Sequence, residues 1–197
     1  MATRFPTMDP LAETLRPLVA AFDRLGIPYL VGGSLASSVR GVARATMDID
    51  VVAIIAAPQT ERLARELGAD WYAEPDQMRA AIAARRAFNV IYIPLGTKVD
   101  IFPATEDFHL SQLERATRAP LAFLDDPVEY PFATAEDILL AKLRWYREGG
   151  EVSQRQWYDI LGILAASPAL DMAYTHSWAE RLRVHDLLAK ALAEAAA

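Results

Sequence analysis

Two aspartates, Asp48 and Asp50, stand one residue apart at the start of the β-branched stretch DIDVV. If this stretch is a strand, both side chains leave the same face about 6.6 Å apart, at ~3.3 Å of rise per residue. Carboxylates this close repel each other and lose hydration unless a cation lies between them. Oxygen ligands without Cys or His select a hard ion, Mg²⁺ or Mn²⁺. The pair therefore predicts a divalent-metal site.

A third carboxylate, Asp100, lies in a second β-rich stretch, KVDIF. If this strand is a neighbour of the first, Asp100 completes an acidic cluster. Three carboxylates on adjacent strands predict a two-metal site for phosphoryl transfer, with the ions ~3.5–4 Å apart.

The turn Gly32-Gly33-Ser34 follows the short apolar run Tyr29–Val31. Glycines let the backbone turn sharply and approach a ligand closely. A helix that begins at Ser34 would direct its N–H groups and the serine hydroxyl toward the same place, which suits a phosphate. Two other roles are compatible with the sequence: Ser34 as a helix cap, and Gly32 in the turn alone.

Hydrophobic periodicity and capping residues predict the elements that must position these groups. Helices are expected over 9–25, 34–40, 58–67 and 80–86, and strands over 29–31, 48–55, 88–93 and 98–102, the last two forming a hairpin. After Pro127 the pattern is helical, with capping signals at Thr134 and Ser153 and further helices over 171–182 and 184–196. We therefore expect an α+β protein in which residues 1–126 form a small mixed β-sheet with flanking helices. Residues 127–197 are expected to form a helical bundle packed on that core.

Composition excludes several classes of function. The 197 residues are 53% hydrophobic and include no cysteine and three histidines, which argues against disulfides and zinc. A formal net charge of −6 argues against a large nucleic-acid-binding surface. With no leader signal and no apolar run near the ~20 residues that span a bilayer, we expect a cytoplasmic protein without a membrane partner.

The order of these motifs resembles a known signature. Gly-Gly-Ser, thirteen residues, Asp-Ile-Asp-Val and a later single aspartate in a strand resemble the polymerase-β-like nucleotidyltransferase superfamily. The segment Arg-Ala-Thr-Met-Asp-Ile-Asp, which begins at Arg44 and leads into the aspartate pair, is similar to the corresponding segment of many members of this superfamily. In the helical part, EDILLAKL and RQWYDI resemble minimal bacterial nucleotidyltransferases of the AbiEii-like type, several of which are toxins of toxin–antitoxin systems.

The resemblance implies a fold, an activity and site residues. It implies a nucleotidyltransferase core that transfers a nucleoside monophosphate from a nucleoside triphosphate (NTP) to a hydroxyl group of an RNA such as tRNA, a protein or a small molecule. Mg²⁺ or Mn²⁺ would be the cofactor, and an antitoxin protein a partner. Asp48 and Asp50 would bind both metal ions, while Asp100 would bind the catalytic ion and act as, or orient, the general base.

The remaining residues that the resemblance implies belong to the nucleotide site. The glycine turn with Ser34 would hold the β- and γ-phosphates, and Lys142 would contact the triphosphate as a point charge. Asp159 would position that lysine or the acceptor. The implied nucleotide-binding set is therefore Gly32, Gly33, Ser34, Arg44, Lys142 and Asp159.

Simpler interpretations remain open for several of these residues. Asp48 alone is compatible with a solvated turn, Lys142 with a surface lysine whose stem covers apolar neighbours, and Asp159 with an i, i+4 pair with Arg155. The tryptophans of the helical part are expected in the core: Trp145, Trp157 and Trp178. The alternative function is a non-catalytic module with the same fold that binds a nucleotide or a partner protein.

Overall fold

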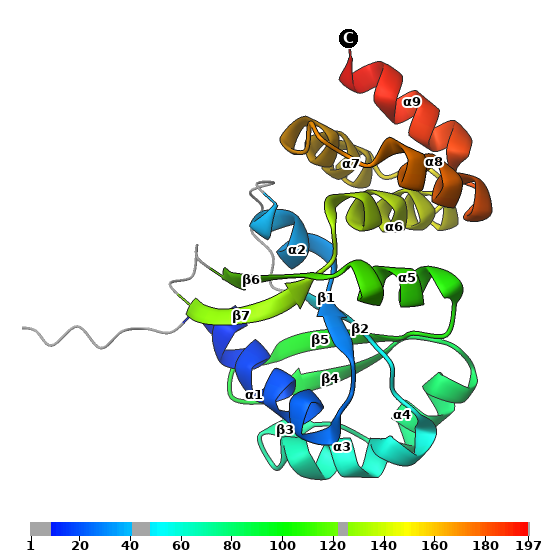
Figure 1. Cartoon of the computed structure of the whole chain (residues 1–197). Coiled ribbons are helices and arrows are strands. Elements are labelled where there is room, and N and C mark those ends of the chain that lie inside the picture. Colours follow the sequence, from blue (N-terminus) through cyan, green and yellow to red (C-terminus); the bar gives the residue numbers. More distant parts are fainter. Residues whose placement is uncertain (1–8, 41–47, 122–125, 197) are drawn as a thin grey trace, which may run out of the picture.

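The computed structural model describes residues 9–40, 48–121 and 126–196. These residues form one mixed sheet with helices on both faces and a group of helices at the C-terminal end (Figure 1). The α+β class expected from the sequence is confirmed. The strands are β1 (Tyr29–Val31), β2 (Ile49–Ala53), β3 (Trp71–Tyr72), β4 (Phe88–Tyr92), β5 (Thr97–Pro103), β6 (Thr117–Leu121) and β7 (Asp126–Phe132).

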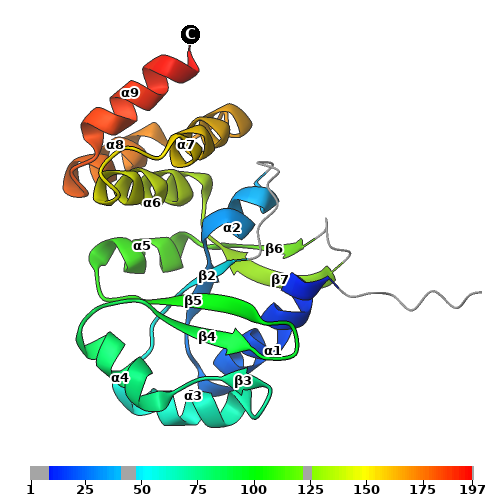
Figure 2. The same cartoon turned by 180° about the vertical axis from the view of Figure 1, so that it is seen from behind.

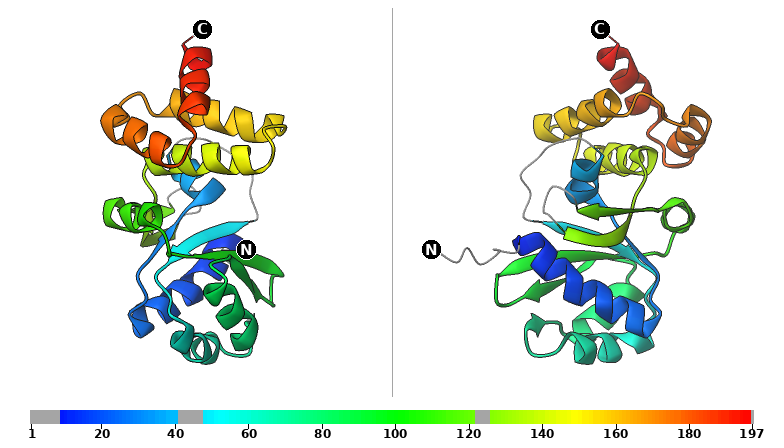
Figure 3. Two further views of the ribbon diagram at one scale, coloured as in Figure 1. Left: turned by 90° about the vertical axis from the view of Figure 1, so that its right-hand side faces the viewer. Right: turned by 60° about the vertical axis from the view of Figure 1, so that its left-hand side comes forward.

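The helices lie in two groups on opposite sides of this sheet. In Figure 3, α1, α3 and α4 cover one face, whereas α6 and the helices that follow it lie beyond the other. The helices are α1 (Pro10–Leu25), α2 (Gly33–Val39), α3 (Thr60–Leu67), α4 (Pro75–Ala83), α5 (Asp107–Arg115), α6 (Ala135–Glu148), α7 (Gln154–Ala166), α8 (Met172–Arg181) and α9 (His185–Ala195), with a short 3₁₀ turn η1 (Ala57–Gln59) before α3.

The strand order β3-β4-β5-β2-β1-β7-β6 places β2 at the centre of the sheet. β2 runs parallel to β5 and antiparallel to β1. Ile49, Val51 and Ala53 of β2 are buried in the core, whereas Asp50 and Val52 are half-buried on the other face. This alternation follows from the two-residue period of a strand, and it turns the Asp50 face of the sheet toward α5 and α6.

Caps define the helix ends that the sequence predicted. Asp9 accepts a hydrogen bond from the Leu11 backbone N–H at 2.9 Å, and Gly26, in the left-handed conformation (φ 61°), ends α1. Thr134 caps α6 and Ser153 caps α7 in the same way, as expected. These local signals need no tertiary contact, which explains why the sequence located them.

Several elements differ from the expectation or were not anticipated. β2 begins at Ile49, so Asp48 precedes the strand, and α4 begins at Pro75 instead of residue 80. The sequence pattern did not predict β3, α5, β6 or β7. Prolines in β6 and β7 weaken a strand pattern. Their position at one end of the sheet, where β6 is the edge strand, tolerates them.

The boundary expected after residue 126 falls within β7, which pairs with β1 through Val31 and Phe132. The sheet therefore continues to Phe132, and the described helical part begins at Ala135. The division of the chain into two domains stays a prediction. Figure 2 shows α6 next to the sheet, with α7, α8 and α9 stacked beyond it. None of the described helices has the length and apolarity needed to cross a membrane.

Candidate active site

The turn after β1 lies directly against β2. The Gly32 backbone N–H donates to the Asp50 carbonyl at 2.8 Å. Gly33 has a positive φ of 57°, and a Cβ placed there would overlap Oδ2 of Asp50 and lie 2.7 Å from its Cγ. A glycine is therefore required at position 33 for two independent reasons: its backbone conformation and the space that the Asp50 carboxylate occupies.

Ser34 is the second residue of α2, and it does not cap that helix. The N-cap is Gly32, which makes no side-chain capping bond. The capping role considered for Ser34 is therefore wrong. The half-buried Ser34 faces a hollow that it shares with Lys142.

The structure brings the predicted carboxylates together around β2 and β5. Asp50 and Asp100 are paired Cα partners on these parallel strands, and the exposed Asp48 immediately precedes β2. Burial, reinforced by repulsion from Asp100 and Asp48, raises the pKa of Asp50 from 3.8 to about 6, while Lys142 and Lys98 oppose this shift. Asp48 and Asp100 therefore both act electrostatically on Asp50.

The structure leaves a metal role for these carboxylates as a prediction. A buried carboxylate with two acidic neighbours is chemically suited to a hard divalent cation. Within residues 9–40, 48–121 and 126–196, however, no three Asp, Glu, His or Cys side chains are gathered as ligands of one ion. Instead, Lys98 Nζ lies 2.7 Å from Asp100 Oδ2, so an ammonium group neutralises this acid.

Lys142 and Asp159 lie on consecutive helices and form an ion pair. Lys142 Nζ lies 3.1 Å from Asp159 Oδ2, which joins α6 to α7. Lys142 is only 7% exposed, so the interpretation as a surface lysine is wrong. The contact between the two residues matches the positioning role implied for Asp159, which stays a prediction. Arg44, the remaining predicted site residue, lies outside the described residues.

Comparison with known proteins shows what this arrangement is similar to. No model of a protein family and no curated protein sequence matches the chain. The solution structure of the antibiotic-resistance factor ANT(2'')-Ia aligns with a TM-score of 0.52 and 14% identity, over 93% of this chain and 97% of that one. A nucleotidyltransferase-like protein from Paracoccidioides brasiliensis aligns with a TM-score of 0.50 and 19% identity, over 90% of each chain. The chain has the nucleotidyltransferase fold.

A further structure of ANT(2'')-Ia, in complex with adenylyl-2''-tobramycin, aligns with a TM-score of 0.49 and 16% identity, over 88% of this chain and 97% of that one. At these identities the likeness concerns the fold. The finer resemblance to AbiEii-like proteins stays a prediction.

Within this nucleotidyltransferase fold, two adjoining hollows meet at Lys142 and Trp145. The first, here called the polar hollow, has a volume of about 290 Å³. Besides Trp145, it is lined by Ser34, Lys142, Ser153, Arg155, Gln156 and Asp159.

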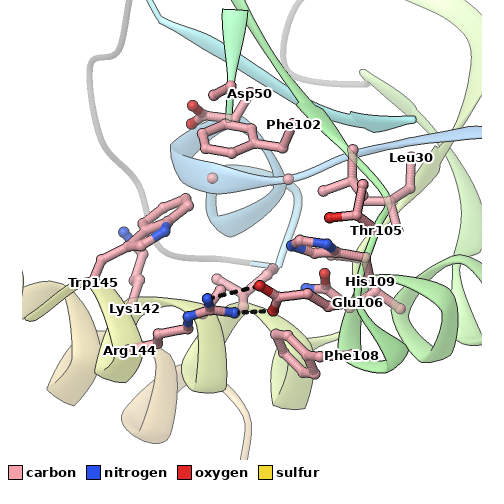
Figure 4. A pocket seen from close by; sticks show the side chains of 18 of the residues that line it. Leu30, Asp50, Phe102, Thr105, Glu106, Phe108, His109, Lys142, Arg144 and Trp145 are labelled. Atoms are coloured by element: carbon pink, nitrogen blue, oxygen red, sulfur yellow. Dashed lines mark hydrogen bonds and ion pairs between the residues drawn. The ribbon is translucent and has the colours of Figure 1, made fainter. Parts of the chain in front are cut away.

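The second, here called the apolar cavity, has a volume of about 200 Å³ and reaches Gly33 and Asp50 (Figure 4). It lies between the Asp50 face of the sheet and helices α5 and α6. Its apolar wall consists of Leu30, Val52, Phe102, Phe108, Ile138 and Trp145.

The sequence pattern predicted three core tryptophans. Trp157 and Trp178 are buried as expected, but the prediction is wrong for Trp145. Its half-buried ring lies 5.7 Å from that of Phe102, centroid to centroid. Phe102 was missed, although its position two residues after Asp100 places it on the same face of β5. The other missed groups, Glu106 and His109, belong to the α5 region, which carried no recognised sequence signal.

Proposed function

We propose that this chain is a metal-dependent nucleotidyltransferase that moves a nucleoside monophosphate from an NTP to a hydroxyl acceptor and releases pyrophosphate. The observation that carries the proposal is the pairing of Asp50 with Asp100 on parallel central strands, beside the turn where Gly33 makes room for the Asp50 carboxylate. The nucleotidyltransferase fold supports it.

Asp48, Asp50 and Asp100 would hold the divalent cation, Mg²⁺ or Mn²⁺. When bound, the cation neutralises the charge of the triphosphate during transfer. The raised pKa of Asp50 supports this assignment, because burial among like charges disfavours an uncompensated carboxylate. A bound cation would therefore stabilise the charged form of these carboxylates.

The protein's own groups would position the reactants. Gly33, Ser34 and Lys142 would hold the β- and γ-phosphates, with Asp159 keeping the lysine in place. Asp100 would orient the acceptor hydroxyl and take its proton. The hydroxyl oxygen then bonds to the α-phosphorus, and the bond from that phosphorus to the β-phosphate oxygen breaks to release pyrophosphate. Catalysis of this kind depends on positioning and charge stabilisation.

The test is transfer by the purified protein with mixed NTPs, Mg²⁺ and separate RNA, protein and small-molecule acceptor pools. We expect pyrophosphate release together with a nucleotide adduct in one pool, detected by mass spectrometry. Asp48→Asn and Asp100→Asn should each lower the rate by at least about 10²-fold, the usual cost of removing a preorganised charge. Asp70→Asn, at an exposed turn residue, is the matched control. Full activity in either site variant would refute the assignment.

The alternative is a non-catalytic module that binds a nucleotide. The Lys98–Asp100 ion pair favours it, because an ammonium group already neutralises the proposed base. Calorimetry with Mg²⁺ and each NTP separates the two functions. Nucleotide binding without pyrophosphate release in any acceptor pool supports the module.

The biological role of a toxin, with an antitoxin partner, rests on the sequence resemblance of the helical part. Its test is growth arrest on induced expression, with Asp48→Asn as the inactive comparison. Arrest by both forms would show that transfer is not the cause.

A further inference from the structure

The two hollows beside Asp50 differ in chemistry, and this difference separates the places of the two substrates. The polar hollow presents two cations, Lys142 and Arg155, and the hydroxyl-bearing residues Ser34 and Ser153. Its one acid among the described lining residues, Asp159, is paired with Lys142. Ammonium, guanidinium and hydroxyl groups are the usual ligands of phosphate oxygens. The phosphates of the NTP therefore belong there, which leaves the apolar cavity on the other side of Trp145 for the acceptor.

The wall of the apolar cavity is built for an uncharged ring. The rings of Phe102 and Trp145 lie 5.7 Å apart, centroid to centroid, at an interplanar angle of 30°, and Figure 4 shows Phe102 directly beside Asp50. Phe102 shares a strand face with Asp100, the proposed base. An acceptor ring packed on Phe102 would thus carry its hydroxyl toward the carboxylates.

Two of the three described acids of the cavity, Glu106 and Glu148, are paired with Arg144, and Arg85 also acts on Glu106 electrostatically. Among the described residues that line the cavity, the acidic ones are Asp50, Glu106 and Glu148. Arg144 binds Glu106 through two contacts of 2.5 and 3.1 Å (Figure 4). It also binds Glu148 at 2.8 Å. A polycationic acceptor needs several carboxylates without such partners, and desolvating its charges here would be costly. Asp50 alone, itself assigned to the cation, cannot meet that need.

Thr105, Gln112 and Arg85 add polar groups to the lining of the cavity, and His109 is the described lining residue with a buried polar atom that lacks a hydrogen-bond partner. His109 extends from α5 into the cavity, and burial lowers its pKa, so that the imidazole is neutral at pH 7. Its Nδ1 atom is buried and, within the described part of the chain, has no hydrogen-bond partner. A single hydrogen bond from a neutral ligand would satisfy this nitrogen.

The cavity also limits the size of the acceptor. Its volume is about 200 Å³. Pockets for drug-sized ligands are typically about 300–1,000 Å³. One or two rings fill the available space.

We infer that the acceptor is a small, uncharged and largely apolar hydroxyl compound of one or two rings, bound in the apolar cavity against Phe102 and Trp145. This inference rests on the proposed function. The hydroxyl oxygen of the acceptor would form the new bond to the α-phosphorus and its proton would pass to Asp100, while the bond from that phosphorus to the β-phosphate oxygen breaks and pyrophosphate leaves.

The test compares binding of a matched pair of probes, para-methylbenzyl alcohol and para-(aminomethyl)benzyl alcohol, by NMR saturation transfer. Tobramycin serves as a polycationic probe, and ATP binding is measured separately. We expect the neutral alcohol to bind more tightly than either cationic compound. Tighter binding of the cationic alcohol or of tobramycin, or no binding of the neutral alcohol, would overturn the inference.

Variants then locate the binding. Phe102→Glu should weaken binding of the neutral alcohol by at least about tenfold, because it adds an unpaired carboxylate to the apolar wall. ATP affinity should not change in Phe102→Ala, which removes the ring and adds no charge near the phosphates. Ile93→Glu places the same charge at an exposed site, 56% accessible, and is the matched control. Loss of ATP affinity in Phe102→Ala would instead assign the cavity to the nucleobase and overturn the inference.

A further substitution keeps the test valid if Phe102→Glu fails to fold. Thr105 is exposed at the rim of the cavity. Thr105→Glu should strengthen binding of the aminomethyl alcohol several-fold, and an unchanged preference would contradict the assigned position. These are binding measurements. A catalytically inactive protein that still prefers the neutral alcohol would refute the proposed function and leave the ligand class standing.

Discussion

Lys142 Nζ lies 3.1 Å from Asp159 Oδ2, and this ion pair joins α6 to α7 at the floor of the polar hollow. The lysine is buried and the side chain of Asp159 is 15% exposed, so water solvates each charge only in part and the ion pair provides the remaining stabilisation. The pair therefore fixes an ammonium group at the junction of the two hollows.

Replacing this lysine should weaken nucleotide binding. Lys142→Met keeps the length of the apolar stem and removes the charge, so NTP affinity should fall by about tenfold, the value of one charge-assisted hydrogen bond. Asp159→Asn retains the ammonium group and should cost less than about threefold. Calorimetric titration with a non-hydrolysable NTP measures both. Lys190→Met, at an exposed residue of α9, is the control, and normal affinity in folded Lys142→Met would contradict the phosphate contact.

A methyl group at Gly33 should damage the site beyond its effect on the backbone. Gly33→Ala and Gly26→Ala both place alanine at a positive φ, 57° and 61°, which costs about 1–2 kcal/mol each. A Cβ at position 26 meets open space, whereas one at position 33 overlaps the Asp50 carboxylate. We expect urea unfolding to show a larger loss for Gly33→Ala, with transfer activity lost in that variant alone. Equal losses and retained activity would show that Asp50 moves aside freely.

Neutralising Asp50 should stabilise the metal-free protein while abolishing transfer. Burial raises its pKa in the folded state to about 6, so the folded protein binds more protons than the unfolded one between pH ~4 and ~6. Stability must therefore fall as pH rises through that window. In EDTA, Asp50→Asn should be more stable than wild type by roughly 1–3 kcal/mol above pH 6, and by much less near pH 4.

Thermal and urea unfolding at several pH values test this pH dependence of the stability difference. The control is Asp76→Asn, whose side chain is 90% exposed. Addition of Mg²⁺ should reduce the difference in unfolding free energy between Asp50→Asn and wild type, because the cation stabilises the wild type. A destabilised Asp50→Asn at pH 7 in EDTA would contradict the assigned charge repulsion.

Lys98 should compete with a divalent cation for Asp100. Its ammonium group lies 2.7 Å from Asp100 Oδ2, and the neighbouring acids raise its pKa, so it remains protonated at neutral pH. Lys98→Gln makes the cluster more negative and should tighten Mn²⁺ binding several-fold, as measured by calorimetry. Arg79→Gln removes a surface charge elsewhere and should have no effect. Weaker Mn²⁺ binding in Lys98→Gln would show that the lysine supports the cation site.

Local patterns in the sequence were sufficient to locate the acidic residues and many element ends. Asp9, Thr134 and Ser153 cap helices because their side chains reach the backbone within three residues, a purely local interaction. The sequence also placed Asp50 and Asp100 on strands, and the register between β2 and β5 confirms that these strands are neighbours.

Other features depended on contacts between distant segments. β6 and β7 contain prolines and were not anticipated, because their strand conformation depends on pairing with each other and with β1. Trp145 was expected in the core because its position on α6 fits an apolar stripe. Its partner Phe102 lies on β5, and their contact at the cavity depends on how the helix docks on the sheet.

The sequence by itself determined the chemical groups: an acidic pair, a third carboxylate and a glycine turn, each defined by residue type and spacing along one segment, to which the family resemblance added a lysine. Only the tertiary structure decided what surrounds them, namely the burial of Lys142 against Asp159, the ammonium group on Asp100 and the apolar cavity beside Asp50. Spacing along the chain sets which side chains share a face. Burial and the shape of a cavity arise from elements far apart in sequence that pack together.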